Sequence, residues 1–122
     1  MFKEVTIGGI TVPMLANGAT PIRYKHIFHK DIISEFQAAQ EDYSKVVNSI
    51  PELAFVMAKQ AEAKEGKVNL DLLNEAMYMT WAEQFGAMDL PLAADDIINL
   101  YLGNNATSSE SKKKAKEKQN VN

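Results

Sequence analysis

The sequence predicts a mostly α-helical protein: a small bundle of about five helices, with a β-hairpin before them and a disordered tail after them. Three observations predict this fold. Apolar residues recur at helical spacing between residues 32 and 102, and two β-branched runs flank a Gly-Gly pair near the N-terminus. Residues 104–122 contain one Val and no Leu, Ile or aromatic residue, so they have little apolar area to bury. We therefore expect a helical domain over residues 1–103 and a disordered tail over residues 104–122.

The charge is divided unevenly between these two parts. Residues 1–103 hold 8 Lys and Arg against 14 Asp and Glu, whereas residues 104–122 hold 5 Lys against 2 Glu. An acidic domain argues against nucleic-acid binding, which needs a basic face. The chain has no Cys, which excludes disulfides and thiolate metal sites. It also has no apolar run of the ~20 residues that span a bilayer and no signal-peptide pattern, so we expect a soluble intracellular protein without a membrane partner.

The β-hairpin is predicted over about residues 3–14. Val5–Ile7 and Ile10–Val12 are β-branched runs, and Gly8-Gly9 between them supplies the positive φ that a tight two-residue turn needs. Pro13 cannot donate a ladder hydrogen bond, so we expect it to limit the second strand.

Helix signals extend from about residue 21 to residue 102. Thr20 as N-cap and Pro21 at the first helical position predict a short helix over residues 21–29. Asp31 is placed to cap the next helix, which we expect over residues 32–50. Its apolar stripe recurs at steps of three and four residues and comprises Ile32, Phe36, Ala39, Tyr43, Val46 and Ile50.

Three further helices are expected. Ser49 and Glu52 have the spacing of a capping box at the start of the third, which Gly66 ends. Asn69 is expected to cap the fourth, which runs to Gly86. The fifth begins near Pro91 and Asp95, and Gly103 ends it. The stripe of the third helix comprises Leu53, Val56, Met57 and Ala61, and that of the fourth comprises Leu70, Leu73, Met77, Trp81 and Phe85.

The fourth helix carries a second apolar signal. Trp81 lies in the middle of its main stripe, and we expect this side chain to be largely buried against the second helix. Leu72 and Met79 are seven residues apart and project opposite that stripe, and Tyr78 lies on a flank. A helix that is apolar on two sides is either the central helix of its bundle or covered by a partner. Leu72, Tyr78 and Met79 are therefore candidate partner-binding residues, and the central-helix alternative stays open.

The sequence contains no motif of a catalytic, cofactor or metal site. His26 and His29 have an i, i+3 spacing that suits a metal, but no third ligand stands at a recognised spacing, and two exposed histidines are the simpler interpretation. Asp95 and Asp96 are adjacent, so they do not face each other as a catalytic pair and are interpreted as partners of a helix dipole. We expect neither an enzyme nor a bound cofactor.

Three segments resemble a known family. Gly18–Asp31, which follows the Val12–Met14 end of the hairpin, together with Ile50–Lys59 and Ala76–Trp81, is similar to the tail assembly chaperones of long-tailed bacteriophages and prophages of Gram-positive bacteria. The resemblance covers most of residues 1–103. It implies a small, helical, non-enzymatic protein of the host cytoplasm that coats the tape-measure protein during tail assembly and is absent from the finished virion.

The resemblance also implies a longer product. Many members of this family are made in two lengths by a programmed ribosomal frameshift, and the extension of the longer form recruits the tail tube protein. Lys112–Lys114 is a run whose codons can be all adenine, so we expect a ribosome to slip there. The alternative interpretation is a generic helical adaptor or regulatory protein whose basic tail contacts nucleic acid. The sequence leaves self-association open.

Overall fold

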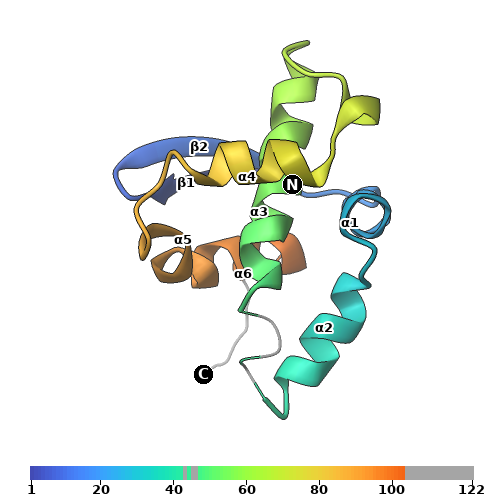
Figure 1. Ribbon diagram of the computed structural model, residues 1–122, viewed down its shortest axis with the longest axis vertical. Helices are drawn as coiled ribbons and strands as arrows, with labels where there is room; N and C mark the ends of the chain where they lie inside the picture. The colour runs from blue at the N-terminus through green and yellow to red at the C-terminus, as the bar shows by residue number, and fades with distance from the viewer. Residues whose placement is uncertain (43, 45–46, 104–122) are drawn as a thin grey trace.

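The computed structural model describes residues 1–42, 44 and 47–103, and it confirms the predicted fold class (Figure 1). In these residues an antiparallel hairpin precedes six α-helices and a short 3-10 helix. The elements are β1 (Phe2–Ile7), β2 (Ile10–Leu15), α1 (Thr20–Phe28), α2 (Ile32–Ala39), α3 (Ser49–Lys64), the 3-10 helix η2 (Leu70–Leu72), α4 (Glu75–Ala82), α5 (Asp89–Leu92) and α6 (Ala94–Leu102). None of the described helices is both long and apolar enough to cross a membrane. The predicted disordered tail lies outside the described residues.

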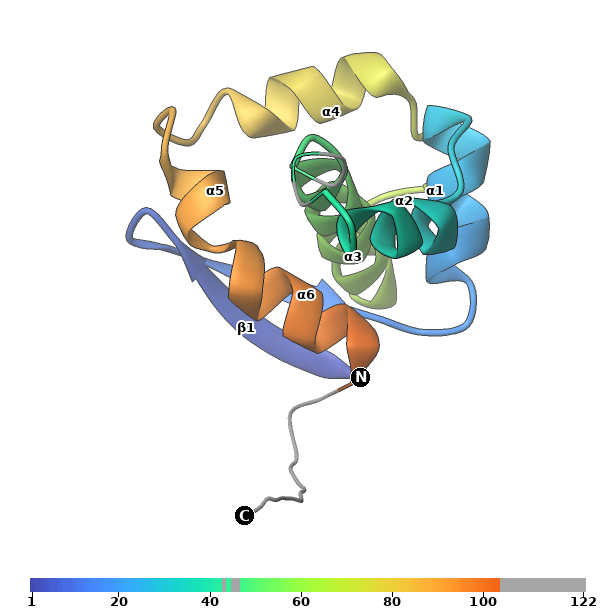
Figure 2. The same cartoon turned by 90° about the horizontal axis from the view of Figure 1, so that it is seen from below.

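The helix α3 lies at the centre of the molecule, and the other elements surround it (Figure 2). It contacts β2 and each of the other described helices, η2 included. The six consecutive residues Leu53 to Ala58 are each at most 1% exposed, so this middle part of α3 is buried on every side. The one-sided stripe predicted for this helix was therefore too narrow. The central helix is α3, whereas the sequence had suggested the fourth helix for that place.

The hairpin turn forms as predicted. Gly8 and Gly9 have φ angles of 57° and 83°, which are the positive values that a tight two-residue turn requires. Side chains alternate between a buried and an exposed face along both strands. The buried face packs against α3 through β2, and it consists of Val5, Ile7, Val12 and Met14.

The second strand continues beyond Pro13, which corrects the expectation that this proline limits it. Met1 and Ala16 exchange two backbone hydrogen bonds at the open end of the hairpin, and the register pairs Pro13 with Glu4. Opposite residues of an antiparallel pair alternate between hydrogen-bonded and non-bonded positions. Pro13 therefore occupies a non-bonded position, where an N–H would point away from β1. The proline therefore removes no hydrogen bond between β1 and β2.

A buried glutamine joins the end of β2 to α1 and α3. The side-chain amide of Gln60 donates to the carbonyl oxygen of Leu15 (2.7 Å) and to the hydroxyl of Thr20 (2.8 Å), and its Oε1 accepts from Arg23 (2.9 Å). These bonds satisfy the buried amide. The predicted N-cap role of Thr20 is wrong, because α1 begins at Thr20 without a side-chain cap and the hydroxyl bonds to Gln60 instead.

The predicted capping box at the start of α3 does not form. Ser49 is the first residue of the helix, and its hydroxyl donates to the Glu35 carboxylate at 2.5 Å. The Glu52 carboxylate accepts from the Tyr24 hydroxyl at 2.8 Å and pairs with Lys30 at 2.7 Å. These two carboxylates therefore link α3 to α1 and α2 rather than closing its own first turn.

The second predicted helix is much shorter than expected. Asp31 caps α2 as predicted, because its carboxylate accepts the N–H groups of Ile33 and Ser34. The helix nevertheless ends at Ala39 instead of residue 50. The Asp42 carboxylate accepts both the N–H and the hydroxyl of Ser44, at 3.1 and 2.6 Å, and such local bonding competes with a continued helix. Within the predicted stripe, Tyr43 and Val46 lie outside the described residues and Ile50 belongs to α3.

The single helix predicted over residues 69–86 is also wrong. Asn69 caps only η2, and the chain is extended at Leu73. Asn74 then caps α4 by accepting the N–H of Met77 at 3.0 Å, and α4 ends at Ala82. The fifth predicted helix is likewise two helices, α5 and α6, although Gly103 ends α6 with a φ of 72° as expected.

Gly8 and Gly9 provide a matched test of the contact between the hairpin turn and α5. A Cβ atom at Gly8 would lie 2.0 Å from Asp89 Oδ2, whereas one at Gly9 would have no neighbour within 4 Å. Both substitutions strain the positive φ. We expect Gly8→Ala to lower the free energy of unfolding by about 1 kcal/mol more than Gly9→Ala does, because the Asp89 side chain must turn away and give up its hydrogen bond with the Gly86 N–H. Urea denaturation measures the difference, and equal losses would contradict the close approach of Asp89.

Candidate binding groove and the predicted partner surface

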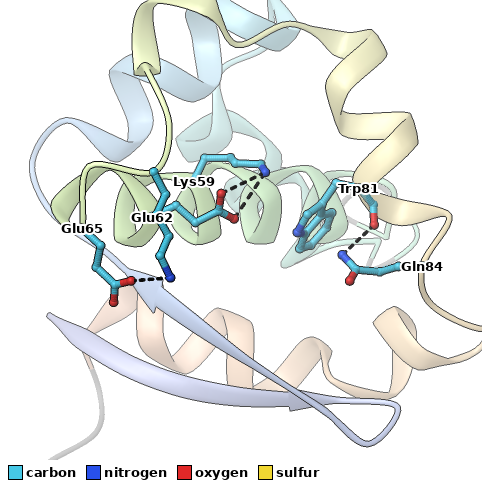
Figure 3. Close-up of polar contacts among 6 residues, drawn as sticks. Lys59, Glu62, Glu65, Trp81 and Gln84 are labelled. Carbon is cyan, nitrogen blue, oxygen red and sulfur yellow. Dashed lines mark hydrogen bonds and ion pairs between the residues drawn. The ribbon is translucent and has the colours of Figure 1, made fainter.

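An open groove of about 750 Å³ lies between β2 and α4. Both elements pack on α3, which contributes the floor between them. The side of β2 provides Ile10, Thr11, Val12 and Pro13, the floor provides Lys59 and Glu62, and the α4 side provides Asn74, Ala76, Met77, Thr80, Trp81 and Gln84. Figure 3 shows Lys59 and Glu62 on the floor and Trp81 and Gln84 on the α4 side.

The accessible charge on the groove floor is negative. Lys59 Nζ lies 3.3 Å from both carboxylate oxygens of Glu62 (Figure 3). It also lies 5.8 Å from the centre of the Phe55 ring. The ammonium therefore has partners on two sides. The Lys59 side chain is 16% exposed and that of Glu62 is 38% exposed, so the carboxylate is the more available group for a ligand.

An aromatic cluster supports the groove from below. The Trp81 ring lies 5.7 Å from Phe55 of α3 and 5.1 Å from Phe85, measured between ring centres. The prediction that Trp81 is buried is confirmed, since it is 8% exposed. The prediction that Trp81 packs against the second helix is wrong. The Trp81 ring packs on Phe55 of α3 instead.

The three predicted partner-binding residues do not share one helix face. Leu72 belongs to η2 and Met79 to α4, and the extended residue Leu73 separates the two helices. Leu72 and Met79 are 67% and 57% exposed, so both side chains are available to a partner. Tyr78 is half-buried, and its ring centre lies 5.3 Å from that of Phe28 and 5.6 Å from that of Phe55. Burial raises the pKa of Tyr78, and the charge of Glu52 adds to the shift.

The two histidines lie apart from the groove. His26 is exposed on α1, and His29 ends that helix with a φ of 60°, its N–H donating to the carbonyl oxygen of Lys25. No group of three or more potential metal-ligating side chains gathers in the part of the chain that the structure describes. Asp95 and Asp96 are exposed in the first turn of α6.

Sequence reasoning missed the groove because the groove combines segments about 65 residues apart. The predicted hairpin did place Thr11 on its second strand, and the helical pattern did place Met77 and Trp81 on one face. Nothing local indicates that this strand and this helix lie on either side of α3. Lys59 and Glu62 carry only an i, i+3 charge pattern, which is typical of any exposed helix.

Comparison of the chain with protein-family models, with curated proteins and with solved structures finds no match.

Removal of the Trp81 ring tests the packing beneath the groove. We expect Trp81→Ala to lower the free energy of unfolding by about 3–5 kcal/mol, the usual cost of emptying a large aromatic site. Because the chain has one Trp, the fluorescence of the native protein reports this site alone. A blue-shifted emission that moves to longer wavelength on denaturation is the expected result. A native spectrum like that of free tryptophan would contradict the burial of Trp81.

Proposed function

We propose that this protein is a non-enzymatic tail assembly chaperone of a long-tailed phage or prophage, and that it binds the tape-measure protein. The observation that carries the proposal is the open groove between β2 and α4, on a protein that also exposes the side chain of Met79 on α4. Met suits adaptable binding surfaces, because it is flexible and polarizable. Exposed apolar side chains on neighbouring elements provide area for a client whose own apolar surface must be covered until assembly.

The segments that resemble the family have structural roles consistent with the proposal. Arg23 and Tyr24, in the most distinctive segment, hold α1 against α3 through Gln60 and Glu52. The segment Ile50–Lys59 supplies the buried length of α3, and Ala76–Trp81 supplies much of the groove side on α4. The resemblance therefore concerns both the scaffold and one side of the candidate site.

Other parts of the proposal depend on residues outside the described range. Binding of the tail tube protein by a frameshifted longer form would begin from the slippage run at Lys112–Lys114. Action in the host cytoplasm and absence from the virion complete the proposed role. The alternative of an adaptor with a nucleic-acid-contacting tail depends on the same terminal lysines.

Co-expression tests the proposal most simply. The tagged full chain is expressed with a candidate tape-measure protein, which is the product of any very long coiled-coil reading frame found next to its gene, and the complex is captured and washed at moderate salt. Capture of that protein supports the chaperone. Failure to capture it, with binding of DNA or RNA that weakens steeply as salt rises, would favour the adaptor.

The exposed residues of η2 and α4 allow a specific prediction. We expect the double substitution Leu72→Ser with Met79→Ser to change the free energy of unfolding by less than about 1 kcal/mol, since exposed side chains contribute little to stability. The same variant should capture at least several-fold less tape-measure protein in the pull-down.

A matched control comes from α1 and α2. Ile22 and Ile33 are 70% and 54% exposed, so Ile22→Ser with Ile33→Ser removes a similar apolar area from another face. The control should keep its capture of the tape-measure protein. Equal losses in the two double variants would mean that the effect is not specific to η2 and α4, and unchanged capture in both would remove Leu72 and Met79 from the site.

A further inference from the structure

We propose that the groove binds an extended peptide segment, which adds as a third strand to the free edge of β2 and carries a Lys or Arg for Glu62. This proposal deepens the proposed function by naming the form of the bound segment, although it is argued from the groove itself. Two features of the groove support it, which are the unpaired edge of β2 and the carboxylate on the floor, and other occupants fit the groove less well.

The strand edge follows from the register. Met1 and Ala16 form a hydrogen-bonded pair, and so by alternation do Val5 and Val12. Thr11 lies between bonded positions, so its N–H and carbonyl groups point away from β1. Pro13 offers a carbonyl oxygen at the next outward position. The edge therefore presents one complete donor and acceptor pair and one further acceptor.

The lining of the groove shows that this edge faces it. Four consecutive residues of β2, Ile10 to Pro13, line the groove. Side chains of consecutive strand residues point to opposite faces of a sheet, so all four residues meet one groove only along the strand edge. Thr11 is exposed, and its neighbour Val12 is buried on the face toward α3. A ligand in the groove would thus lie against backbone, not against one face of the hairpin.

An extended ligand uses this edge and a helical ligand does not. The backbone groups of a helix bond within the helix, whereas a strand offers free N–H and carbonyl groups to a sheet edge. A residue opposite Thr11 would exchange two hydrogen bonds with it, and a nearby N–H would bond to the Pro13 carbonyl. The four lining residues of β2 correspond to about 13 Å of strand. The contact is therefore short, and its strength depends on the bonds at Thr11.

The floor selects the side chains of the ligand. Residues on either side of the one opposite Thr11 would point to the same face as Val12, toward Glu62 and Trp81. The Glu62 carboxylate, which is partly exposed beside its partner Lys59, favours Lys or Arg at one position, and the surface of Met77 and Trp81 favours an apolar side chain at another. The α4 side agrees in charge, because residues 74–84 contain two Glu and no Lys, Arg or His.

Two other occupants fit less well. A second copy would have to bring its own β2 edge to this one, and the α4 side of each groove would stand between the two edges. The chain's own residues 104–122 are rich in Asn, Ser and Lys, which are poor strand formers, and contain one Val as their only large aliphatic residue. The extended, cationic and partly apolar segment of another protein is the occupant that the groove fits.

The test selects ligands without the tape-measure protein. A yeast-displayed library of random dodecapeptides is sorted for binding to the full chain, and the enriched peptides are synthesised and titrated. We expect enrichment of alternating sequences that contain Lys or Arg and apolar residues. A consensus with apolar residues at i, i+3 and i+4 would indicate a helical ligand and overturn the proposal, as would the absence of any enrichment.

Two matched pairs of variants locate the binding. Thr11→Pro removes the outward N–H of β2, and Thr6→Pro does the same on β1, where Thr6 is the register partner of Thr11. We expect Thr11→Pro to weaken peptide binding about tenfold, the effect of losing one or two backbone hydrogen bonds, and Thr6→Pro to change it less than about twofold. Glu62→Gln should weaken binding and reduce its salt dependence. Glu65→Gln, which loses a similar ion pair with Lys67 at 2.8 Å, should not.

The outcomes separate this proposal from the proposed function. Equal binding by the wild type and by a folded Thr11→Pro variant overturns the strand-addition proposal. If Thr11→Pro does not fold, amide exchange of the wild type decides, because bound peptide must slow the exchange of the Thr11 N–H. Capture of the tape-measure protein without any selected peptide would leave the chaperone standing and remove the strand site. If peptides are selected but the tape-measure protein is not captured, the strand site stands and the proposed chaperone function is removed.

Discussion

The burial of α3 on all sides is the constraint on which the rest of the structure depends. The other described helices have between three and nine residues, and isolated helices of that length are unstable in water. A lone two-stranded hairpin is equally marginal. Each of these helices therefore depends on its contact with α3, and the hairpin depends on the contact that β2 makes with it. The residues of α3 from Leu53 to Ala58 offer apolar surface in every direction. Gln60 extends this arrangement, because its satisfied amide holds the end of β2 and the start of α1 at fixed positions.

The same constraint creates the groove. Since β2 and α4 are both fixed to α3, they stand on either side of it and expose the floor around Lys59 and Glu62. The aromatic contacts of Trp81 with Phe55 and Phe85 keep α4 in place. The free edge of β2 and the accessible carboxylate thus lie on a packed scaffold. A short segment bound there would lose little of its contact energy to rearrangement of the protein.

The sequence predicted those features that depend on neighbouring residues. The Gly8-Gly9 turn, the Asp31 cap and the Gly103 terminus all form as expected, because each is determined within a few residues. Helix lengths were wrong where a side chain bonds locally to the backbone: Asp42 takes the N–H of Ser44, and Asn74 starts a new helix after an extended residue. The spacing of apolar residues carries no information about these bonds. The groove was not predicted, because it depends on which elements lie side by side around α3.

Amide hydrogen exchange of the full chain, measured with and without the co-expressed tape-measure protein, tests the central claim most directly. The account predicts that binding slows exchange in the middle of β2 and along α4, while the amides of Leu53 to Ala58 exchange slowly in both states. Leu72 and Met79 should lie at the border of the protected region. Protection confined to α1 and α2, or no change in a complex that remains intact, would contradict the proposed site.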